Sequence, residues 1–142
     1  MTWEDAVEEY TRALELAPIA EAYAGRALLR KKLGRSSEAL ADYTKAIQIA
    51  PIVDYYVQQA ALYEQAGDVE RARASYNSAI ELRPDVPYTY RARATLRERL
   101  QDVAGAQKDR EIADQIEKPI VNEPLPGRKA KSADSKTGPE DQ

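Results

Sequence analysis

The sequence contains no cysteine, no histidine and no phenylalanine among its 142 residues, and only one tryptophan. Without cysteine, disulfides and thiolate metal sites are excluded, and the redox compartment leaves no trace in the composition. Without histidine, the chain lacks the usual general base and the commonest protein metal ligand. These absences argue against an enzyme, so we expect no catalytic residues, no cofactor and no bound metal.

Long apolar runs are also missing. No stretch approaches the roughly 20 residues that span a bilayer, and the acidic start MTWEDAVEEY is unlike a signal peptide. The net charge of −3, from 21 basic and 24 acidic residues, gives no electrostatic reason to expect nucleic-acid binding, which depends on clustered Lys and Arg. We therefore predict a soluble, cytoplasmic protein that binds neither membranes nor nucleic acids.

The residues that the chain does contain suit packed helices. Alanine and leucine supply much of the 43% hydrophobic content, nine tyrosines supply most of the aromatic rings, and β-branched residues are few. At this length we expect a single domain. The predicted fold class is all-α.

A pattern of small residues, a tyrosine and a proline recurs every 33 residues. Three sets of residues coincide under this shift: Tyr10 with Tyr43 and Tyr76, Ala13 with Ala46 and Ala79, and Pro18 with Pro51 and Pro84. The same shift aligns Gly34 with Gly67. A weaker fourth copy follows at a spacing of 34, with Gln101 in place of the turn glycine and Arg110 in place of the tyrosine. Self-similarity at this period is typical of stacked structural units.

The repeated residues have separate structural roles. An alanine in the middle of a helix lets the neighbouring helix approach, and a tyrosine fills the gap between successive helix pairs. Gly34 and Gly67 supply a left-handed turn without a Cβ penalty. Each proline ends a helix because it cannot continue one. The pattern therefore predicts a series of helix–turn–helix pairs.

This pattern resembles the tetratricopeptide repeat, a 34-residue helix–turn–helix with a W-x2-L-G-x2-Y stretch followed by A-x3-F, A and P. Residues 39–51 and 72–84 match its second half, with tyrosine in place of the Phe. The first half is looser, because Tyr23 and Tyr56 stand where the family has Trp. The resemblance covers about residues 3–117. It implies an α-solenoid that binds other proteins.

We divide the chain into a repeat domain, residues 1–118, and a tail, residues 119–142. The predicted helices are residues 3–16, 20–33, 36–49, 53–65, 69–82, 87–100 and 103–117. The first is a lone second-type helix, and the others form pairs within residues 20–51, 53–84 and 87–118. A lone first helix is expected either in a fragment of a longer array, which we favour, or in an array capped by one helix. The predicted N-caps are Thr2, Ser36 or Ser37, Asp68 and Asp102.

The tail differs in composition from the repeats. It has four prolines, two glycines and no apolar periodicity, so we predict that it is disordered. Arg128, Lys129 and Lys131 form a small basic cluster, which we interpret as part of a solvated tail. A docking or targeting motif is the alternative interpretation.

In stacked helix pairs the first helix of each pair lines the concave surface, and the resemblance implies that this groove holds a peptide or a partner helix. Helical register gives the inward residues. The first pair contributes Glu21, Ala24, Leu28, Lys31 and Lys32, the second contributes Asp54, Val57, Gln58, Ala61, Glu64 and Gln65, and the third contributes Tyr88, Arg91, Thr95, Glu98 and Arg99. This groove is basic at its ends and acidic in its middle, which would suit an extended peptide with some acidic side chains. The alternative is that these residues are ordinary solvated helix faces.

The best-known binding mode of the family is a carboxylate clamp, in which Lys, Asn and Arg hold the acidic C-terminus of a chaperone. The matching positions here are Ala24, Leu28, Gln58, Tyr88 and Ala92. None of them is a cation, and only Gln58 offers an amide. The sequence therefore argues against a chaperone-tail clamp.

Four tyrosines stand at the starts of the second and third pairs. We expect Tyr56 and Tyr90 to lie in the core. Tyr88 and Tyr55 are the candidates for exposed contact residues, because tyrosine is favoured in binding surfaces.

The predicted function is a non-catalytic scaffold for protein–protein interaction. The alternative is self-association as a homodimer, or docking to another domain, through the open N-terminal helix, where Trp3, Val7 and Tyr10 would be exposed. Catalysis has no support, because no phosphate-binding glycine loop and no nucleophile–base set appears in the sequence.

Overall fold

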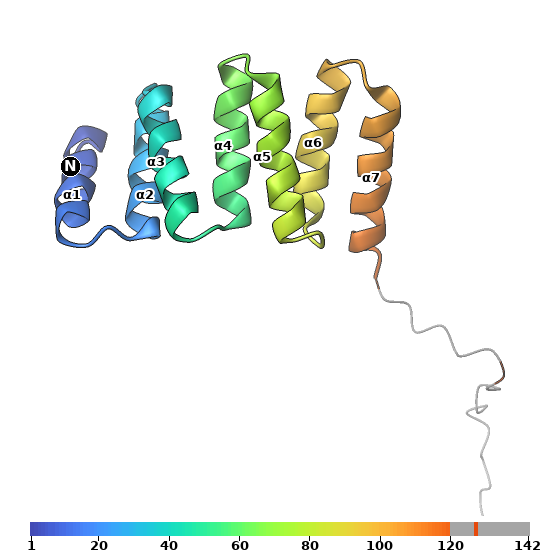
Figure 1. Cartoon of the computed structure of the whole chain (residues 1–142), viewed down its shortest axis with the longest axis horizontal. Coiled ribbons are helices and arrows are strands. Elements are labelled where there is room, and N and C mark those ends of the chain that lie inside the picture. The colour runs from blue at the N-terminus through green and yellow to red at the C-terminus, as the bar shows by residue number, and fades with distance from the viewer. Residues whose placement is uncertain (120–126, 128–142) are drawn as a thin grey trace, which may run out of the picture.

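The computed structural model describes residues 1–119 and residue 127, and within them the chain forms seven α-helices (Figure 1). The helices are α1 (Trp3–Leu16), α2 (Ala20–Lys32), α3 (Ser36–Ile49), α4 (Val53–Gln65), α5 (Val69–Leu82), α6 (Pro87–Arg99) and α7 (Val103–Glu117). All seven predicted helices are present, and only the ends of α2 and α6 differ from the prediction, by one residue each. The predicted disorder beyond Pro119 and the basic cluster of the tail lie outside the described residues.

The helices follow one another along the long axis of the molecule, each antiparallel to the next, and α3 lies in front of α2 in this view (Figure 1). After the lone helix α1, the pairs α2–α3, α4–α5 and α6–α7 pack most closely, and successive pairs meet through α3 against α4 and α5 against α6. We call α2, α4 and α6 the first-type helices and the other four the second-type helices. The loops that join successive pairs all lie along one edge, the lower edge in Figure 1, which we call the loop edge.

Left-handed residues make the tight turns within the pairs. The backbone φ angle is +76° at Gly34, +79° at Gly67 and +64° at Gln101. Glycine adopts this conformation without a Cβ penalty, whereas a glutamine adopts it at a cost. The third turn therefore keeps the geometry of the first two although its glycine has been replaced.

The N-caps confirm three of the four predictions. Thr2 and Asp5 form a reciprocal capping box at α1, with bonds of 3.2 and 2.8 Å. Asp68 caps α5 and Asp102 caps α7 through their side-chain oxygens. The prediction of a serine cap for α3 is wrong. Ser36 is already the first helical residue, and the N-cap position belongs to Arg35, whose side chain makes no capping bond.

Small residues bring the helices together, as the repeat pattern predicts. The alanines at the six packing positions are fully buried: Ala27, Ala39, Ala60, Ala72, Ala94 and Ala106. Tyr43 and Tyr76 are only 3% and 4% exposed, because each lies between two successive pairs. Tyr10, at the same repeat position on α1, is 36% exposed. The buried residues therefore form two clusters, one that contains Tyr43 and one that contains Tyr76, whereas Tyr10 on α1 remains partly exposed.

Two of the four tyrosine predictions are reversed. Tyr55 is 8% exposed, and its ring centroid lies 6.5 Å from that of Tyr43, whereas Tyr56 is half-buried. The two residues differ by one position, or about 100° around the helix, and the residue that faces α3 is Tyr55. Tyr90 is buried as predicted and donates a hydrogen bond to the Pro84 carbonyl at 2.8 Å.

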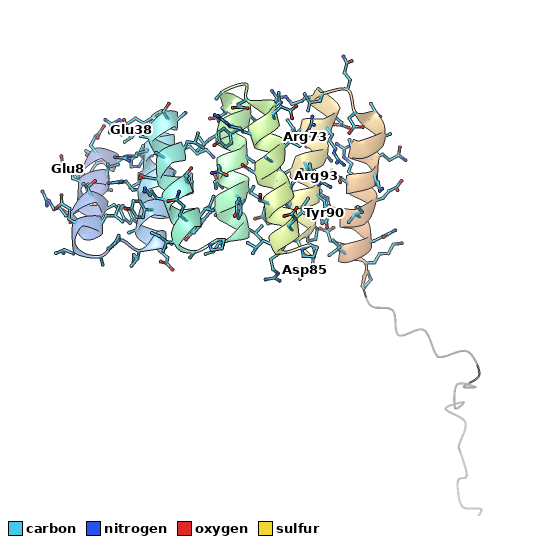
Figure 2. The ribbon with its side chains drawn as sticks, viewed as in Figure 1. Glu8, Glu38, Arg73, Asp85, Tyr90 and Arg93 are labelled. Atoms are coloured by element: carbon cyan, nitrogen blue, oxygen red, sulfur yellow. The ribbon has the colours of Figure 1, made fainter. Side chains whose placement is uncertain are left out.

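A buried aspartate joins the two helices of the third pair. Asp109 on α7 is fully buried, and Arg93 donates to both of its oxygens, at 2.7 and 2.9 Å. Arg97 completes the cluster with a contact of 3.0 Å. The Arg93 side chain thus extends from α6 toward α7 (Figure 2). Such a forked arginine–carboxylate pair combines charge with fixed geometry.

The first pair contains the same arrangement. Asp42 on α3 is 3% exposed and accepts bonds from Arg26 at 2.7 and 2.9 Å and from Arg30 at 2.8 Å. The hydrogen bond from Arg26 to Asp42 raises the pKa of the guanidinium. We call each set of three residues an Arg–Asp–Arg cluster.

The middle pair has neutral residues at these positions. The 33-residue shift places Gln59, Tyr63 and Ser75 where the first pair has Arg26, Arg30 and Asp42. The Ser75 hydroxyl donates to Gln59 Oε1 at 2.8 Å, and Gln59 Nε2 donates to the Thr44 hydroxyl at 3.2 Å. A hydrogen bond between uncharged side chains therefore joins α4 and α5 at the position where the other two pairs have an Arg–Asp–Arg cluster.

Candidate protein-binding groove

None of the sixteen residues predicted to line the groove is fully buried. Nine are exposed: Glu21, Leu28, Lys32, Asp54, Gln65, Tyr88, Thr95, Glu98 and Arg99. Seven are half-buried: Ala24, Lys31, Val57, Gln58, Ala61, Glu64 and Arg91. The helices that carry them are neighbours in space, because α4 and α6 touch directly although α5 separates them in the sequence. The first-type helices therefore form one face of the row.

Side chains bind the first-type helices to one another across this face. Lys31 Nζ on α2 donates to Gln58 Oε1 on α4 at 3.0 Å. Arg99 on α6 reaches Glu64 on α4 at 2.9 Å. Glu64 also accepts a 2.6 Å bond from the Tyr76 hydroxyl, and burial together with this bond raises the pKa of Tyr76. Side-chain contacts thus link α2 to α4 and α4 to α6 across this face.

Other predicted groove cations are engaged elsewhere. Arg91 donates to Glu117 at 2.7 and 2.8 Å and to Asp114 at 2.9 Å, both on α7. Lys32 lies over the Trp3 ring of α1, with its nitrogen 5.5 Å from the ring centroid. The α6 end of the predicted groove is therefore largely neutralised by carboxylates, whereas Lys31 and Lys32 at the α2 end have no carboxylate partner within residues 1–119. Sequence register could place these residues on a face but could not show that a neighbouring second-type helix supplies their partners.

The loop edge contains a pocket that the sequence reasoning missed. It has a volume of about 440 Å³ and is lined by Pro51, Ile52, Val53, Asp54, Leu82, Arg83, Val86 and Tyr88. We call it the loop-edge pocket. Its lining comes from two inter-pair loops and the starts of α4 and α6, so residues 30 or more positions apart in the sequence meet there. The apolar residues that recur beside the inter-pair prolines, such as Ile19 and Ile52, were the available signal, and the sequence analysis did not use them.

The N-terminal face is partly uncovered. Trp3 is 51% exposed and Tyr10 is 36% exposed. Val7, predicted to be exposed with them, is buried at 7% because it points toward the packed side of α1. The Tyr10 ring lies against Gly25 of α2 so closely that a Cβ there would approach it to 2.6 Å. The candidate interface on α1 is therefore Trp3 and Tyr10 without Val7.

No group of three or more His, Cys, Asp or Glu side chains among the described residues is arranged to hold a metal ion. No helix of the described part is both long enough and apolar enough to cross a bilayer. The described surface of α2, α4 and α6 presents exposed apolar side chains, such as Leu28 and Tyr88, together with carboxylates such as Glu21 and Asp54.

Comparison with known families assigns the fold to a class. Two family profiles, both described as tetratricopeptide repeat, match residues 20–51 and 53–86. The comparison with curated proteins finds no match. The matched repeats show that this chain is a tetratricopeptide-repeat protein over residues 20–86. Domains of this family are generally modules for protein–protein interaction and usually non-catalytic.

Solved structures of this kind superpose on most of the chain. A crystal structure of MamA has a TM-score of 0.76 at 21% identity, over 81% of this chain and 68% of that one. A tetratricopeptide repeat protein from Parabacteroides merdae has a TM-score of 0.76 at 22% identity, over 83% of this chain and 48% of that one. The first repeat domain of Spaghetti (RPAP3), bound to an HSP90 peptide, has a TM-score of 0.65 at 24% identity, over 71% and 81%. At these identities the likeness shows the fold alone.

Proposed function

We propose that this protein is a scaffold that binds a peptide or helix of a partner protein on the face formed by α2, α4 and α6. The observation that carries the proposal is the exposure of large apolar side chains on an otherwise polar face. Leu28 on α2 is 43% exposed and Tyr88 on α6 is 46% exposed. Exposed apolar groups rimmed by polar residues mark interaction surfaces.

The links across the face support the proposal. Because Lys31 binds Gln58 and Glu64 binds Arg99, the three first-type helices are fixed relative to one another before binding. A surface that is ordered in advance loses little entropy on association. The small half-buried residues Ala24 and Ala61 leave room for a partner backbone between the larger side chains.

The partner differs in chemistry from the HSP90 peptide held by the Spaghetti (RPAP3) domain. An acidic C-terminus needs cations, and the positions of this chain that match the family's clamp carry none. Arg91, one turn beyond Tyr88, is already bound to two carboxylates of α7. We therefore propose a partner that is held mainly by apolar contacts.

Affinity capture from a lysate of the source cell, compared between variants, tests the proposal. The groove variant is Leu28→Arg/Thr95→Arg, which places two long cations on exposed positions of α2 and α6. The control is Ala41→Arg/Gln48→Arg, which adds the same charge to exposed positions of the second-type helix α3. We expect the partner to be captured by wild type and by the control but lost by the groove variant. Equal capture by all three proteins would rule out the groove.

A second candidate function is association through α1. Tyr10 is 36% exposed, whereas its repeat equivalents Tyr43 and Tyr76 are 3% and 4% exposed under a first-type helix. Trp3 widens the same surface. We propose that a helix from a second copy or from another domain can cover this face as a first-type helix covers the others.

Sedimentation equilibrium tests whether the protein self-associates through α1. Wild type is expected to form a dimer that Trp3→Glu/Tyr10→Glu abolishes, while Leu28→Arg/Thr95→Arg retains it. A monomeric wild type at all accessible concentrations would remove self-association and leave docking of another domain to be tested by capture.

A further inference from the structure

The loop-edge pocket gathers exposed apolar side chains from parts of the chain that are distant in sequence. Ile52, Leu82 and Tyr88 are 42%, 39% and 46% exposed, and all three line it. Its volume of about 440 Å³ falls within the range of ligand pockets, ~300–1,000 Å³. Three large, partly exposed apolar side chains around one pocket form an apolar surface patch of the kind that marks interaction sites.

Two charged residues line the pocket, Asp54 and Arg83. Arg83 is held by Asp85 through two bonds of 3.0 Å, so that arginine is neutralised within the loop. Asp54 lines the pocket, and Glu21 occupies the same repeat position on α2. Within residues 1–119 neither Asp54 nor Glu21 has an ion-pair partner. The pocket is therefore apolar inside and acidic at its border.

Two tyrosines near the border have raised pKa values, to which burial and the Asp54 carboxylate both contribute. Burial raises the pKa of Tyr88, and the Asp54 carboxylate raises it further. Burial also raises the pKa of Tyr55, with added contributions from Glu21 and Asp54. Both carboxylates thus lie close enough to one buried ring to act on it together.

The acidic residues also have a local structural role. Glu21 and Asp54 lie in the first turns of α2 and α4, where negative charge stabilises the positive end of a helix. That role accounts for their presence at this repeat position. It does not account for the third copy, where the position is occupied by Tyr88, whose exposed ring completes the pocket. Between α4 and α6, therefore, the Asp54 carboxylate lines the same pocket as the exposed ring of Tyr88.

We propose that the loop-edge pocket binds a partner segment in which an aliphatic or aromatic side chain is flanked by a lysine or arginine. The apolar side chain enters between Ile52, Leu82 and Tyr88, and the neighbouring cation pairs with Asp54. This inference rests on the proposed scaffold function and names the chemistry of the partner at one end of the groove. Charge complementarity selects the basic flank, because Asp54 has no ion-pair partner within residues 1–119, whereas Arg83, the other charged residue of the lining, is already bonded to Asp85.

Selection from a library of random short peptides displayed on phage tests the proposal with the full chain as the target. The selected peptides are expected to share an apolar residue within a few positions of a Lys or Arg. A synthetic copy of the strongest of them is then titrated by fluorescence anisotropy. We expect Asp54→Lys and Ile52→Ser each to weaken its binding about tenfold or more, about 1.4 kcal/mol.

Matched controls separate the pocket from general effects on charge and stability. Glu15→Lys changes charge as Asp54→Lys does, but at an exposed site on α1. Ile19→Ser alters the repeat equivalent of Ile52, which is 51% exposed and lies outside the pocket. Both controls are expected to bind the peptide like wild type. Circular dichroism confirms that each variant remains helical.

Several outcomes would overturn the proposal. They are a library that yields no binder, a consensus without a cation, and a peptide that binds Asp54→Lys as well as it binds Glu15→Lys. Loss of binding only in Leu28→Arg/Thr95→Arg would overturn the pocket while supporting the groove. If a peptide of residues 119–133 binds the pocket as tightly as the selected peptides, the occupant is the chain's own tail and not a partner. Capture of the cellular partner unaffected by the groove variant would instead count against the proposed function itself.

Discussion

The middle helix pair carries neutral residues where the first and third pairs carry an Arg–Asp–Arg cluster. Asp109 is fully buried between two arginines, whereas Ser75 at the equivalent position shares one hydrogen bond with Gln59. The backbone is the same in both places, with a helix pair, a left-handed turn and buried alanines. The repeat therefore fixes where a polar link joins the two helices but leaves its chemistry free.

The Arg–Asp–Arg cluster and the Ser75–Gln59 hydrogen bond should respond differently to the loss of one residue. A buried carboxylate is expensive to desolvate and is stable only while its partners remain. A hydroxyl–amide pair costs less to bury and gains less when formed. We therefore expect the outer pairs to be sensitive to the loss of one residue and the middle pair to be tolerant.

The largest effect is expected from Asp109→Ala. This change leaves Arg93 and Arg97 largely buried without their common carboxylate, at a cost of about 3 kcal/mol or more in the free energy of unfolding. Urea denaturation followed by circular dichroism measures it. A loss below about 1 kcal/mol would show that the cluster is not a stabilising link and would remove the contrast between the pairs.

Replacing the whole cluster of the third pair by the neutral residues of the middle pair should restore most of the free energy of unfolding that Asp109→Ala loses. The variant Arg93→Gln/Arg97→Tyr/Asp109→Ser gives the third pair the residues of the middle pair. We expect it to unfold within about 1.5 kcal/mol of wild type, because whole buried ion clusters can be exchanged for neutral groups at little cost. If the triple variant is as unstable as Asp109→Ala in the same denaturation experiment, the neutral set works only in its own surroundings.

A smaller loss is expected from Ser75→Ala in the middle pair. The substitution removes one hydrogen bond to Gln59 and should lower the free energy of unfolding by about 1 kcal/mol. It is the matched control for Asp109→Ala, since both change the same repeat position to alanine. A loss equal to that of Asp109→Ala would contradict the expected tolerance of the middle pair.

The smallest effect is a gain, expected from Thr89→Val in the third pair. Thr89 occupies the repeat position of Tyr55, is fully buried, and has a hydroxyl without a hydrogen-bond partner in the described part of the chain. Replacing that hydroxyl by a methyl group should raise the free energy of unfolding by about 0.5 kcal/mol. Thermal unfolding of the two proteins side by side detects the change, and a decrease would indicate that the hydroxyl is satisfied.

Local signals predicted most of the fold. The 33-residue spacing, the alanines and the glycines give seven helices with nearly correct ends, because each signal acts within one helix or one turn. The reversal of Tyr55 and Tyr56 marks the limit of such reasoning. One residue of register decides which ring faces α3, and the family pattern allows an aromatic at either position.

The candidate site was predicted only in part, because its charges depend on partners from other helices. Register placed Arg91 on the groove face, but its carboxylates stand on α7, more than 20 positions away. The loop-edge pocket joins the starts of α4 and α6, and only their positions in space bring Ile52 and Tyr88 together. Pairings of this kind come from the stacking of the repeats and are absent from any single repeat.

Site-directed photocrosslinking in the source cell tests the central claim, that the partner binds the face of α2, α4 and α6. A photoreactive phenylalanine is placed in turn at Leu28 and Thr95 on that face and at Ala41 and Gln48 on α3. The account predicts one crosslinked partner from the two first-type positions and none from the two α3 positions. Crosslinks of that partner from Ala41 or Gln48, with none from Leu28 or Thr95, would contradict it.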